Sequence, residues 1–262
     1  MLAPNQSSAG FVWLVGAGPG AADLITMRGL NLLRHAEAVV CDELVNRELL
    51  GHCPLGCEQH FVGKRAGCHS ATQSEINALL VALASAGKKI VRLKGGDPLI
   101  FGRAGEEMQA LREAGIPFEI VPGVTAATAA SAVAGLPLTH RDHSSAVVFV
   151  TGHQCAANTS ALDWGSLARL RATLCFYMGV RRLPEIARNL LGHGMPVDMP
   201  LAVISEATLP AQKILIGTLD EAEKLSAGLT GQPALVVIGE VVRLSTFAAE
   251  LPQLHVQAMA AG

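Results

Sequence analysis

Short apolar runs alternate with helical patterns along almost the whole of this 262-residue chain. In the first half, the clearest helix is expected at 72–86, where Thr72 and Glu75 form a capping-box pattern. Strands are predicted on either side of it, at 11–15, 38–42, 58–62, 88–93 and 117–121. Such alternation is typical of a mostly parallel sheet with helices on both faces. We therefore predict an αβα domain over residues 11–135.

The same alternation starts again near residue 146 and predicts a second αβα domain over 140–246. Its helix is expected at 183–192, with Pro184 in the first turn. Its strands are predicted at 146–150, 173–178, 201–205, 213–217 and 234–239. The fourth of these follows the third too closely for a helical crossover, so the sheet should be mixed. With no low-complexity linker between the domains, we expect the active site in the cleft between them.

Composition and charge exclude several classes of function. The chain has 20 basic and 22 acidic residues, which is not the balance of a general nucleic-acid or membrane-surface binder. No apolar run approaches the ~18–20 residues of a membrane span, and the first ten residues lack the blocks of a signal peptide. Six cysteines in a chain of this size do not form a disulfide framework, so we expect a reducing, cytoplasmic environment.

The segment VGAGPG, residues 15–20, directly follows the first predicted strand. Gly16, Gly18 and Ala21 have the spacing of a dinucleotide-binding fingerprint, in which glycines let backbone amides approach phosphate. Pro19 lies inside the segment and removes one backbone donor. A nicotinamide site and a plain tight turn therefore both remain open for this loop.

Two further segments follow predicted strands. GGDP, residues 95–98, offers bare backbone to a ligand, and Asp97 either accepts hydrogen bonds from that ligand or caps the turn. VPGVTAATAA, residues 121–130, leads into a helix with Thr125 and Ala126 in its first turn. Backbone amides there can meet a ligand or simply be capped. Both loops are candidate ligand sites.

Basic residues gather in two other segments, GKRAGCH (63–69) and LTHRDH (138–143). Loop cations are usually solvated, but we expect these to lie on the same side as the glycine loops. They could then hold a polyanionic substrate. A metal site is the alternative for the group His52, Cys53, Cys57, His60, Cys68 and His69. Its cysteine spacing lacks the matched second pair of a zinc site, so we predict no metal.

Taken together and in order, these motifs resemble those of uroporphyrinogen-III C-methyltransferases. The matching blocks are VGAGPG, LITMRG, GKRAGCH, VRLKGGDPLIFGRAGEE, VPGVTAA, GLPLTHRD, VTGH and FYMG, from about residue 11 to about residue 245. GGDP is shared by tetrapyrrole methyltransferases broadly, whereas GKRAG-x-H with PLTHRD is narrower. The resemblance implies S-adenosyl-L-methionine as methyl donor and S-adenosyl-L-homocysteine as product. It also implies methylation of uroporphyrinogen III at C2 and then C7, giving precorrin-1 and precorrin-2 for sirohaem or cobalamin biosynthesis.

The resemblance further implies a role for individual residues. Asp42 matches a proposed proton acceptor, and Lys64 matches a proposed proton donor. Cofactor contacts are implied for Pro19, Gly95, Gly96, Asp97, Ile100, Thr125, Ala126, Tyr177, Met178 and Ala207. Substrate contacts are assigned to Arg65, His69, Phe101, His140 and Arg141. Ala207 stands where relatives often have glycine, and Cys41, Leu99 and Val133 replace aromatic residues common in the family.

Three alternatives to this function stay open. One is a later methyltransferase of corrin synthesis, which acts on a precorrin that is already methylated. The others are a nicotinamide-dependent oxidoreductase and a non-catalytic tetrapyrrole carrier. Only ten residues precede the first predicted strand, so we expect a stand-alone transferase without the dehydrogenase–ferrochelatase module of fused sirohaem synthases. By resemblance, we expect a homodimer with no nucleic-acid or membrane partner.

Overall fold

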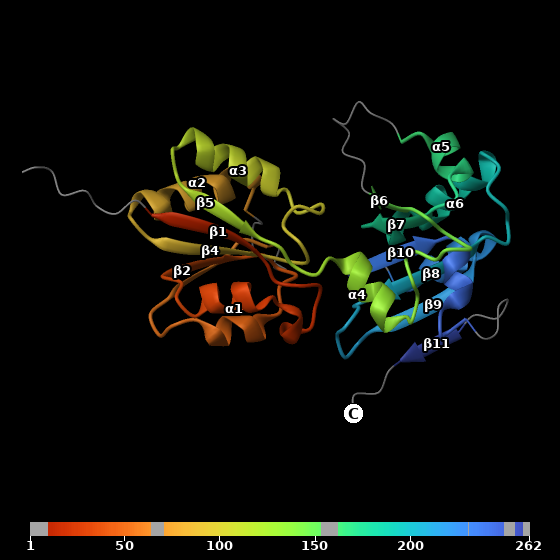
Figure 1. Cartoon of the computed structure of the whole chain (residues 1–262), viewed down its shortest axis with the longest axis horizontal. Coiled ribbons are helices and arrows are strands. Elements are labelled where there is room, and N and C mark those ends of the chain that lie inside the picture. The colour runs from red at the N-terminus through yellow and green to blue at the C-terminus, as the bar shows by residue number, and fades with distance from the viewer. Residues whose placement is uncertain (1–9, 64–70, 153–161, 230, 249–254, 259–262) are drawn as a thin grey trace, which may run out of the picture. The chain divides into compact units, whose positions relative to one another are not determined.

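The computed structural model describes residues 10–63, 71–152, 162–229 and 231–248, and the backbone of 255–258. The chain divides into two compact units, Met1–Ala126 and Ala127–Gly262. Each unit has its own sheet, with helices packed against it (Figure 1). Within the described ranges, no helix has the length and hydropathy needed to span a membrane.

The first unit is built on a five-stranded sheet in the order β3-β2-β4-β1-β5. The strands are β1 (Phe11–Gly16), β2 (Ala38–Cys41), β3 (Glu58–Phe61), β4 (Lys89–Lys94) and β5 (Phe118–Val121). The helices are α1 (Met27–Leu33), α2 (Gln73–Ser85), α3 (Ala104–Glu113) and the 3-10 helices η1 (Ala22–Leu24) and η2 (Arg47–His52). Every pairing among these strands is parallel, which confirms the sheet expected from the sequence.

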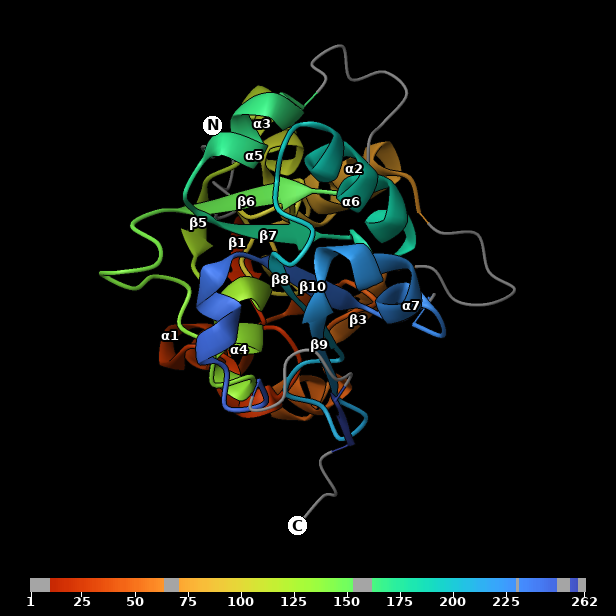
Figure 2. The same cartoon turned by 90° about the vertical axis from the view of Figure 1, so that its right-hand side faces the viewer.

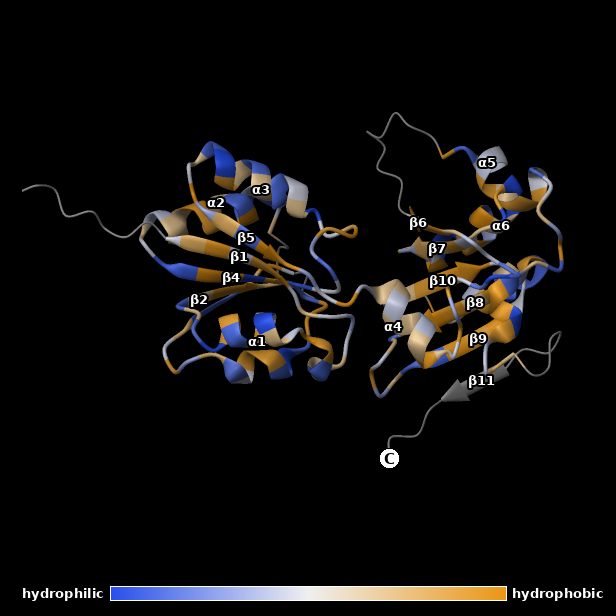
Figure 3. Ribbon diagram, viewed as in Figure 1, coloured by the Kyte–Doolittle hydropathy of each residue, from blue (hydrophilic) through white to orange (hydrophobic). Residues whose placement is uncertain are grey.

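Helices cover both faces of this sheet, with α1 on one side and α2 and α3 on the other (Figure 1). Val12 and Leu14 of β1 pack into the core under α2 and α3, whereas Val15 packs into the core with α1. Burial on both faces favours apolar residues along the central strands, which is why these strands appear in the sequence as nearly continuous apolar runs. In Figure 3 the hydrophobic colour accordingly follows the strands. The capping box of α2 forms as predicted: Thr72 Oγ1 accepts from the Glu75 amide at 3.2 Å, and Glu75 Oε2 accepts from the Thr72 amide at 2.6 Å.

The second unit is built on a six-stranded mixed sheet in the order β11-β9-β8-β10-β7-β6. The strands are β6 (Val147–Thr151), β7 (Thr173–Tyr177), β8 (Pro200–Ser205), β9 (Lys213–Thr218), β10 (Ala234–Ile238) and β11 (His255–Ala258). The helices are α4 (Ala126–Val133), α5 (Trp164–Arg169), α6 (Leu183–Gly192), α7 (Ala222–Ser226), η3 (Val180–Arg182), η4 (Leu219–Glu221) and η5 (Glu240–Leu244). Strands β6 and β7 are parallel, and β8 and β9 form the predicted antiparallel pair. Strand β11 was not predicted.

The two faces of the second sheet are covered by different helices. Along β8, Leu201 and Val203 join the core that contains residues of α6 and α7, whereas Ala202 and Ile204 join the core that contains α4 and η5. Figure 2 shows α4 and α7 on opposite sides of these strands. Helix α4 thus packs with the second sheet through its buried alanines, among them Ala127. The sequence-based limits 11–135 and 140–246 assign this helix to the first domain, whereas the observed division begins the second unit at Ala127.

Candidate active site

Three loops at the carboxyl edge of the first sheet are hydrogen-bonded into one substructure. Their strands are neighbours, because β1 lies between β4 and β5. After β1 and β4, the Gly96 amide donates to the Gly18 carbonyl at 2.7 Å, and the Gly18 amide donates to the Gly96 carbonyl at 3.3 Å. After β5, the Gly123 amide donates to Asp97 Oδ2 at 3.0 Å. The motifs VGAGPG, GGDP and VPGV therefore meet at one place.

Three glycines in these loops, Gly16, Gly18 and Gly123, are required because backbone packs directly against backbone. A Cβ on Gly16 would lie 2.6 Å from the Gly123 Cα, and a Cβ on Gly123 would lie 2.3 Å from the Gly96 oxygen. Gly18 has a φ of +82°, and a Cβ there would lie 3.0 Å from the Leu24 oxygen. Close packing and left-handed backbone thus account for Gly16 and Gly18 without a bound dinucleotide, which favours the tight-turn interpretation of this segment.

Gly95 and Gly96 are different, because the space above their backbone is open. The atom nearest to a Cβ on Gly95 would be the Leu44 Cβ at 3.4 Å, and nothing would come closer than 3.9 Å to a Cβ on Gly96. Both glycines are half-buried, as are the neighbouring candidate residues Pro19, Ile100, Thr125 and Ala126. This is an accessible surface of bare backbone at a strand end, where α/β sheets bind ligands.

Asp97 holds this loop in shape. Its Oδ1 accepts from the Leu99 amide at 2.8 Å, and its Oδ2 accepts from the Gly123 amide. The capping role that the sequence left open is therefore present. Each carboxylate oxygen can accept a further hydrogen bond, so the same side chain retains capacity to bind a ligand.

Residues with left-handed backbone follow strands in each of the two units. Among the described non-glycine residues, positive φ occurs at Phe101, Arg103, Met178, Glu206 and Thr208, with values from 47° to 69°. The first two follow β4, the third follows β7, and the last two flank Ala207 after β8. Such backbone is energetically unfavourable for residues with a side chain, and it clusters at functional sites.

The second unit brings three of its candidate residues to one edge of its sheet. Through β10, Leu235 pairs with Tyr177 and Ala234 pairs with Ser205, so Met178 and Ala207 both follow strand ends at that edge. The Tyr177 hydroxyl accepts from the Ala127 amide at 3.2 Å. This contact places the start of α4 next to the end of β7.

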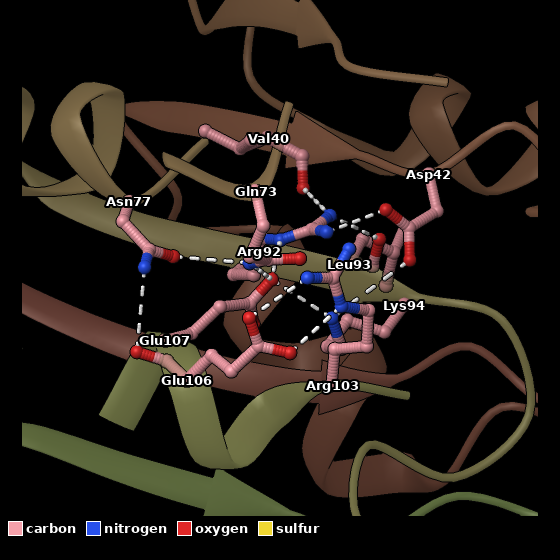
Figure 4. Close-up of polar contacts among 10 residues, drawn as sticks. All are labelled: Val40, Asp42, Gln73, Asn77, Arg92, Leu93, Lys94, Arg103, Glu106 and Glu107. Carbon is pink, nitrogen blue, oxygen red and sulfur yellow. Dashed lines mark hydrogen bonds and ion pairs between the residues drawn. The ribbon is translucent and has the colours of Figure 1, made fainter. Parts of the chain in front are cut away.

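Asp42 lies at the carboxyl end of β2 and is bound to a group of buried charges (Figure 4). Arg92 Nη2 donates to Asp42 Oδ1 at 2.5 Å, and Arg92 Nε donates to Glu107 Oε1 at 3.0 Å. Lys94 Nζ donates to the same Glu107 oxygen at 2.9 Å. The side chains of Arg92 and Lys94 are each 2% exposed and that of Glu107 is 0% exposed, whereas that of Asp42 is 32% exposed. Asp42 is thus the member of the group that solvent or substrate can reach.

The two cations of this group respond differently to burial. Burial by itself would lower the pKa of Arg92, but the carboxylates of Asp42 and Glu107 outweigh it and raise that pKa. Burial lowers the pKa of Lys94, and the positive charge of Arg92 lowers it further, with only partial compensation from the carboxylates. Arg92 is therefore the more firmly charged partner of Asp42.

Arg92, Lys94 and Glu107 were not identified from the sequence. The available signal was in the strand KIVRLK, where two cations alternate with apolar residues in a strand buried on both faces. Charged residues are almost never fully buried unless they are paired. That pattern alone indicates an ionic partner inside the fold, without identifying it as Glu107 of α3.

The proposed substrate residues are not all brought together. Phe101 follows β4 and is 41% exposed, near the open glycines. His140 and Arg141 lie in a turn at the start of β7, where Thr173 Oγ1 donates to the Leu138 carbonyl at 2.7 Å. This is the end of β7 opposite to Met178, so the expected common edge is not observed within the second unit. The two residues stay a prediction as substrate ligands.

Several other candidates are buried or lie outside the described ranges. Lys64, Arg65, Cys68 and His69 fall outside these ranges. Burial raises the pKa of the Cys41 thiol to about 11 and that of Cys53 to about 12. Within the described ranges, no group of three or more His, Cys, Asp or Glu residues is arranged to hold a metal ion.

Comparison with known proteins gives consistent matches over most of the chain. The family model described as Tetrapyrrole (Corrin/Porphyrin) Methylases matches residues 12–223. A siroheme synthase of Baumannia cicadellinicola subsp. Homalodisca coagulata is 51% identical over 240 residues, which cover 92% of this chain and 52% of that protein. The chain spans about half the length of the curated relatives it matches.

The chain also resembles solved structures of methyltransferases. A uroporphyrin-III C-methyl transferase from Thermus thermophilus, complexed with S-adenyl homocysteine, is 39% identical with a TM-score of 0.76 and covers 89% of this chain and 99% of that one. A cobalt precorrin-4 methyltransferase is 28% identical with a TM-score of 0.80 and covers 92% of this chain and 99% of that one.

Proposed function

This chain belongs to the tetrapyrrole (corrin/porphyrin) methylase family, and we propose that it methylates uroporphyrinogen III at C2 and then C7, giving precorrin-1 and precorrin-2. The methyl donor is S-adenosyl-L-methionine, in keeping with the family and with the solved relative that holds S-adenyl homocysteine. A homodimer is part of the proposal and rests on resemblance alone.

The observation that carries the proposal is the position of the open glycine backbone beside Asp42. The nearest neighbour of a Cβ on Gly95 would be Leu44, which lies two residues after Asp42. A surface suited to a ligand and a reachable carboxylate are thus adjacent in the same unit. The half-buried Gly95, Gly96, Thr125 and Ala126 fit a ligand with ribose, amino-acid and adenine groups, because the two glycines have no side chain that would obstruct its approach.

When bound, S-adenosyl-L-methionine supplies an electrophilic methyl carbon on a positively charged sulfur. The task of the protein is then to align the reactants and to manage one proton for each methyl group transferred. Asp42 is the proposed acceptor of the pyrrole N–H proton, which makes the ring carbon more nucleophilic. Lys64 is the proposed proton donor. Each such role is worth about 10²–10⁴-fold in rate.

The test is an anaerobic assay with enzyme, methyl-labelled S-adenosyl-L-methionine and uroporphyrinogen III. We expect a product that carries two labelled methyl groups by mass and has the absorbance of a dipyrrocorphin. Asp42→Asn should lower kcat by about 10²–10⁴-fold, while the Kd of S-adenosyl-L-homocysteine stays within about twofold. Absence of any labelled tetrapyrrole would end the proposal, and an equal loss of turnover and cofactor affinity would assign Asp42 to structure.

A methyltransferase that acts on an already methylated precorrin is the second candidate. It is favoured by the cobalt precorrin-4 methyltransferase, whose TM-score of 0.80 exceeds the 0.76 of the uroporphyrin-III enzyme. The sequence identities, 28% against 39%, favour the first candidate. A substrate panel of uroporphyrinogen III, precorrin-2 and later precorrins separates the two by the ratio of their kcat/KM values.

A further inference from the structure

The guanidinium of Arg92 connects the exposed carboxylate of Asp42 to the interior of the first unit. Besides its bonds to Asp42 and Glu107, its Nη1 donates to the Val40 carbonyl at 3.2 Å and to the Leu93 carbonyl at 3.3 Å. These carbonyls belong to two adjacent strands, β2 and β4. A planar group held by two strands and a helix has no free rotation. The direction of its hydrogen bond to Asp42 is therefore set by the sheet.

We propose that Arg92 is a positioning residue, which holds Asp42 Oδ1 so that Oδ2 is the oxygen that accepts the substrate proton. The inference rests on the proposed role of Asp42. Oδ1 is occupied by Arg92, whereas Oδ2 lies 3.9 Å from Lys94 Nζ, which is too far for a hydrogen bond. Fixing one oxygen orients the other, because the two share one planar group.

Glu107 makes this arrangement possible. A buried guanidinium without a counter-charge would be strongly unfavourable, and an exposed aspartate would offset only part of that cost. Glu107 is wholly buried on α3 and accepts from Arg92, from Lys94 and, at 3.4 Å, from Gln73. Two cations therefore face two carboxylates, and the group has no net formal charge. Arg92 can then remain charged and in place while Asp42 gains and releases a proton.

The proton transfer itself is simple to balance. Asp42 Oδ2 takes the N–H proton of the pyrrole as the new carbon–carbon bond forms. The electron pair of that N–H bond stays in the ring, and the pair of the broken carbon–sulfur bond leaves with sulfur. Asp42 then returns its proton to solvent before the next transfer. No oxidant or reductant is required.

A double-mutant cycle in kcat tests the proposal. Arg92→Gln alone would leave Glu107 underpaired and endanger folding, so the change is made as Arg92→Gln with Glu107→Gln, which removes one charge of each sign. We expect this pair to lower kcat about 10²-fold through misplacement of Asp42, with the Kd of S-adenosyl-L-homocysteine within about twofold of wild type. In an Asp42→Asn background, the same pair should lower kcat less than about threefold.

The matched control is Gln73→Ala, which removes a neutral neighbour of the buried Glu107 and retains the hydrogen bond between Arg92 and Asp42. We expect its kcat to fall much less than that of the paired variant. If the paired substitution lowered kcat by the same factor in the wild-type and Asp42→Asn backgrounds, its role would be generally structural and the proposal would be overturned. An unchanged kcat in the wild-type background would overturn it as well. A crystal structure gives a readout independent of activity: without Arg92 the Asp42 side chain should leave its rotamer, and an unchanged rotamer would contradict the inference.

Failure of the proposed function is distinguishable from failure of this inference. If the substrate panel identifies a later precorrin, the cycle is measured with that substrate, and the error lies in the proposed substrate. If Asp42→Asn turns over at the wild-type rate on the best substrate, Asp42 is not the base and the inference is overturned with it.

Discussion

Gly95 and Gly123 are both conspicuous in the sequence, but the structure requires them for different reasons. Gly123 is enclosed by the backbone of the neighbouring loops, whereas Gly95 lies beside open space and has no left-handed backbone. A side chain at the first position would collide inside the fold. A side chain at the second would intrude only on a ligand. Substitutions at these two positions should therefore affect different properties: stability at Gly123 and ligand binding at Gly95.

Gly95→Ala should weaken binding without loss of stability. Its added Cβ makes only ordinary contact with Leu44 in the free protein, but it would occupy the surface assigned to the methyl donor. We expect at least a tenfold increase in the Kd of S-adenosyl-L-homocysteine by calorimetry, with an unchanged midpoint of thermal unfolding. Gly123→Ala is the matched comparison, and overpacking there should cost about 1–3 kcal/mol of stability. Wild-type affinity in Gly95→Ala would show that the ligand lies elsewhere.

At this scale, the candidate residues predicted from the sequence belong to motifs, whereas those found only in the structure are defined by tertiary contacts. Asp42, Gly95 and Asp97 stand in recognisable segments at strand ends. Arg92 and Glu107 come from a strand and a helix, and nothing in the spacing of their letters says that they meet. Their pairing depends on the angle at which α3 crosses β4, which is a property of packing rather than of local pattern.

Regular elements were the most predictable part of the molecule. Helix α6 occupies the predicted residues 183–192, since Pro184 suits a first turn and Leu183, Ile186 and Leu190 share a buried face. Strand β11, HVQA, was missed because four residues with little apolar periodicity carry almost no signal. Its pairing with β9 supplies the hydrogen bonds that define it.

Helix α2 offers a test of local sequence determinants. Thr72→Ala removes the side chain that accepts from the Glu75 amide, so we expect a loss of about 1 kcal/mol in the free energy of unfolding by urea titration. Thr72→Ser retains the hydroxyl and should stay within about 0.5 kcal/mol of wild type. Equal stability of the two variants would mean that the cap contributes nothing to this helix.

The molecule as a whole contains two separate sets of hydrophobic cores, one set in each unit. Residues of α2 and α3 pack with β1 and β4 in the first unit, and residues of α6 and α7 pack with β8 and β10 in the second. The sequence predicted this division because the strand–helix alternation starts twice. The sequence did not predict the exact boundary at α4, because the residues of an alanine-rich helix show no preference for one sheet over the other.

Two buried thiols allow each unit to be followed by itself. Burial raises the pKa of Cys41 in the first unit to about 11 and that of Cys175 in the second to about 12, so both should resist alkylation at pH 8 until their unit unfolds. Leu80→Ala should lower the urea midpoint for labelling of Cys41, and Leu190→Ala should lower that for Cys175. Each substitution should cost its own unit about 2–5 kcal/mol in the free energy of unfolding.

Peptide mass spectrometry after pulsed alkylation reads both midpoints in one experiment. We expect each substitution to shift the thiol of its own unit and to leave the other within error. If each shifts both thiols equally, the chain unfolds as a single cooperative body, and the two-unit description fails as a description of stability.

The contact of Gly16, Gly96 and Gly123 has a consequence for how this chain can diverge. The backbones of Gly16 and Gly123 lie so close to each other and to the Gly96 oxygen that a methyl group on either would have to displace a neighbouring loop. Neither Gly16 nor Gly123 can therefore accept a larger residue while the neighbouring loops keep their place, whereas Gly96 is restricted by its left-handed backbone, with a φ of +67°. We expect specificity for a different ring or donor to evolve instead at exposed side chains, such as Leu99 and Phe101 of the first unit and Met178 of the second.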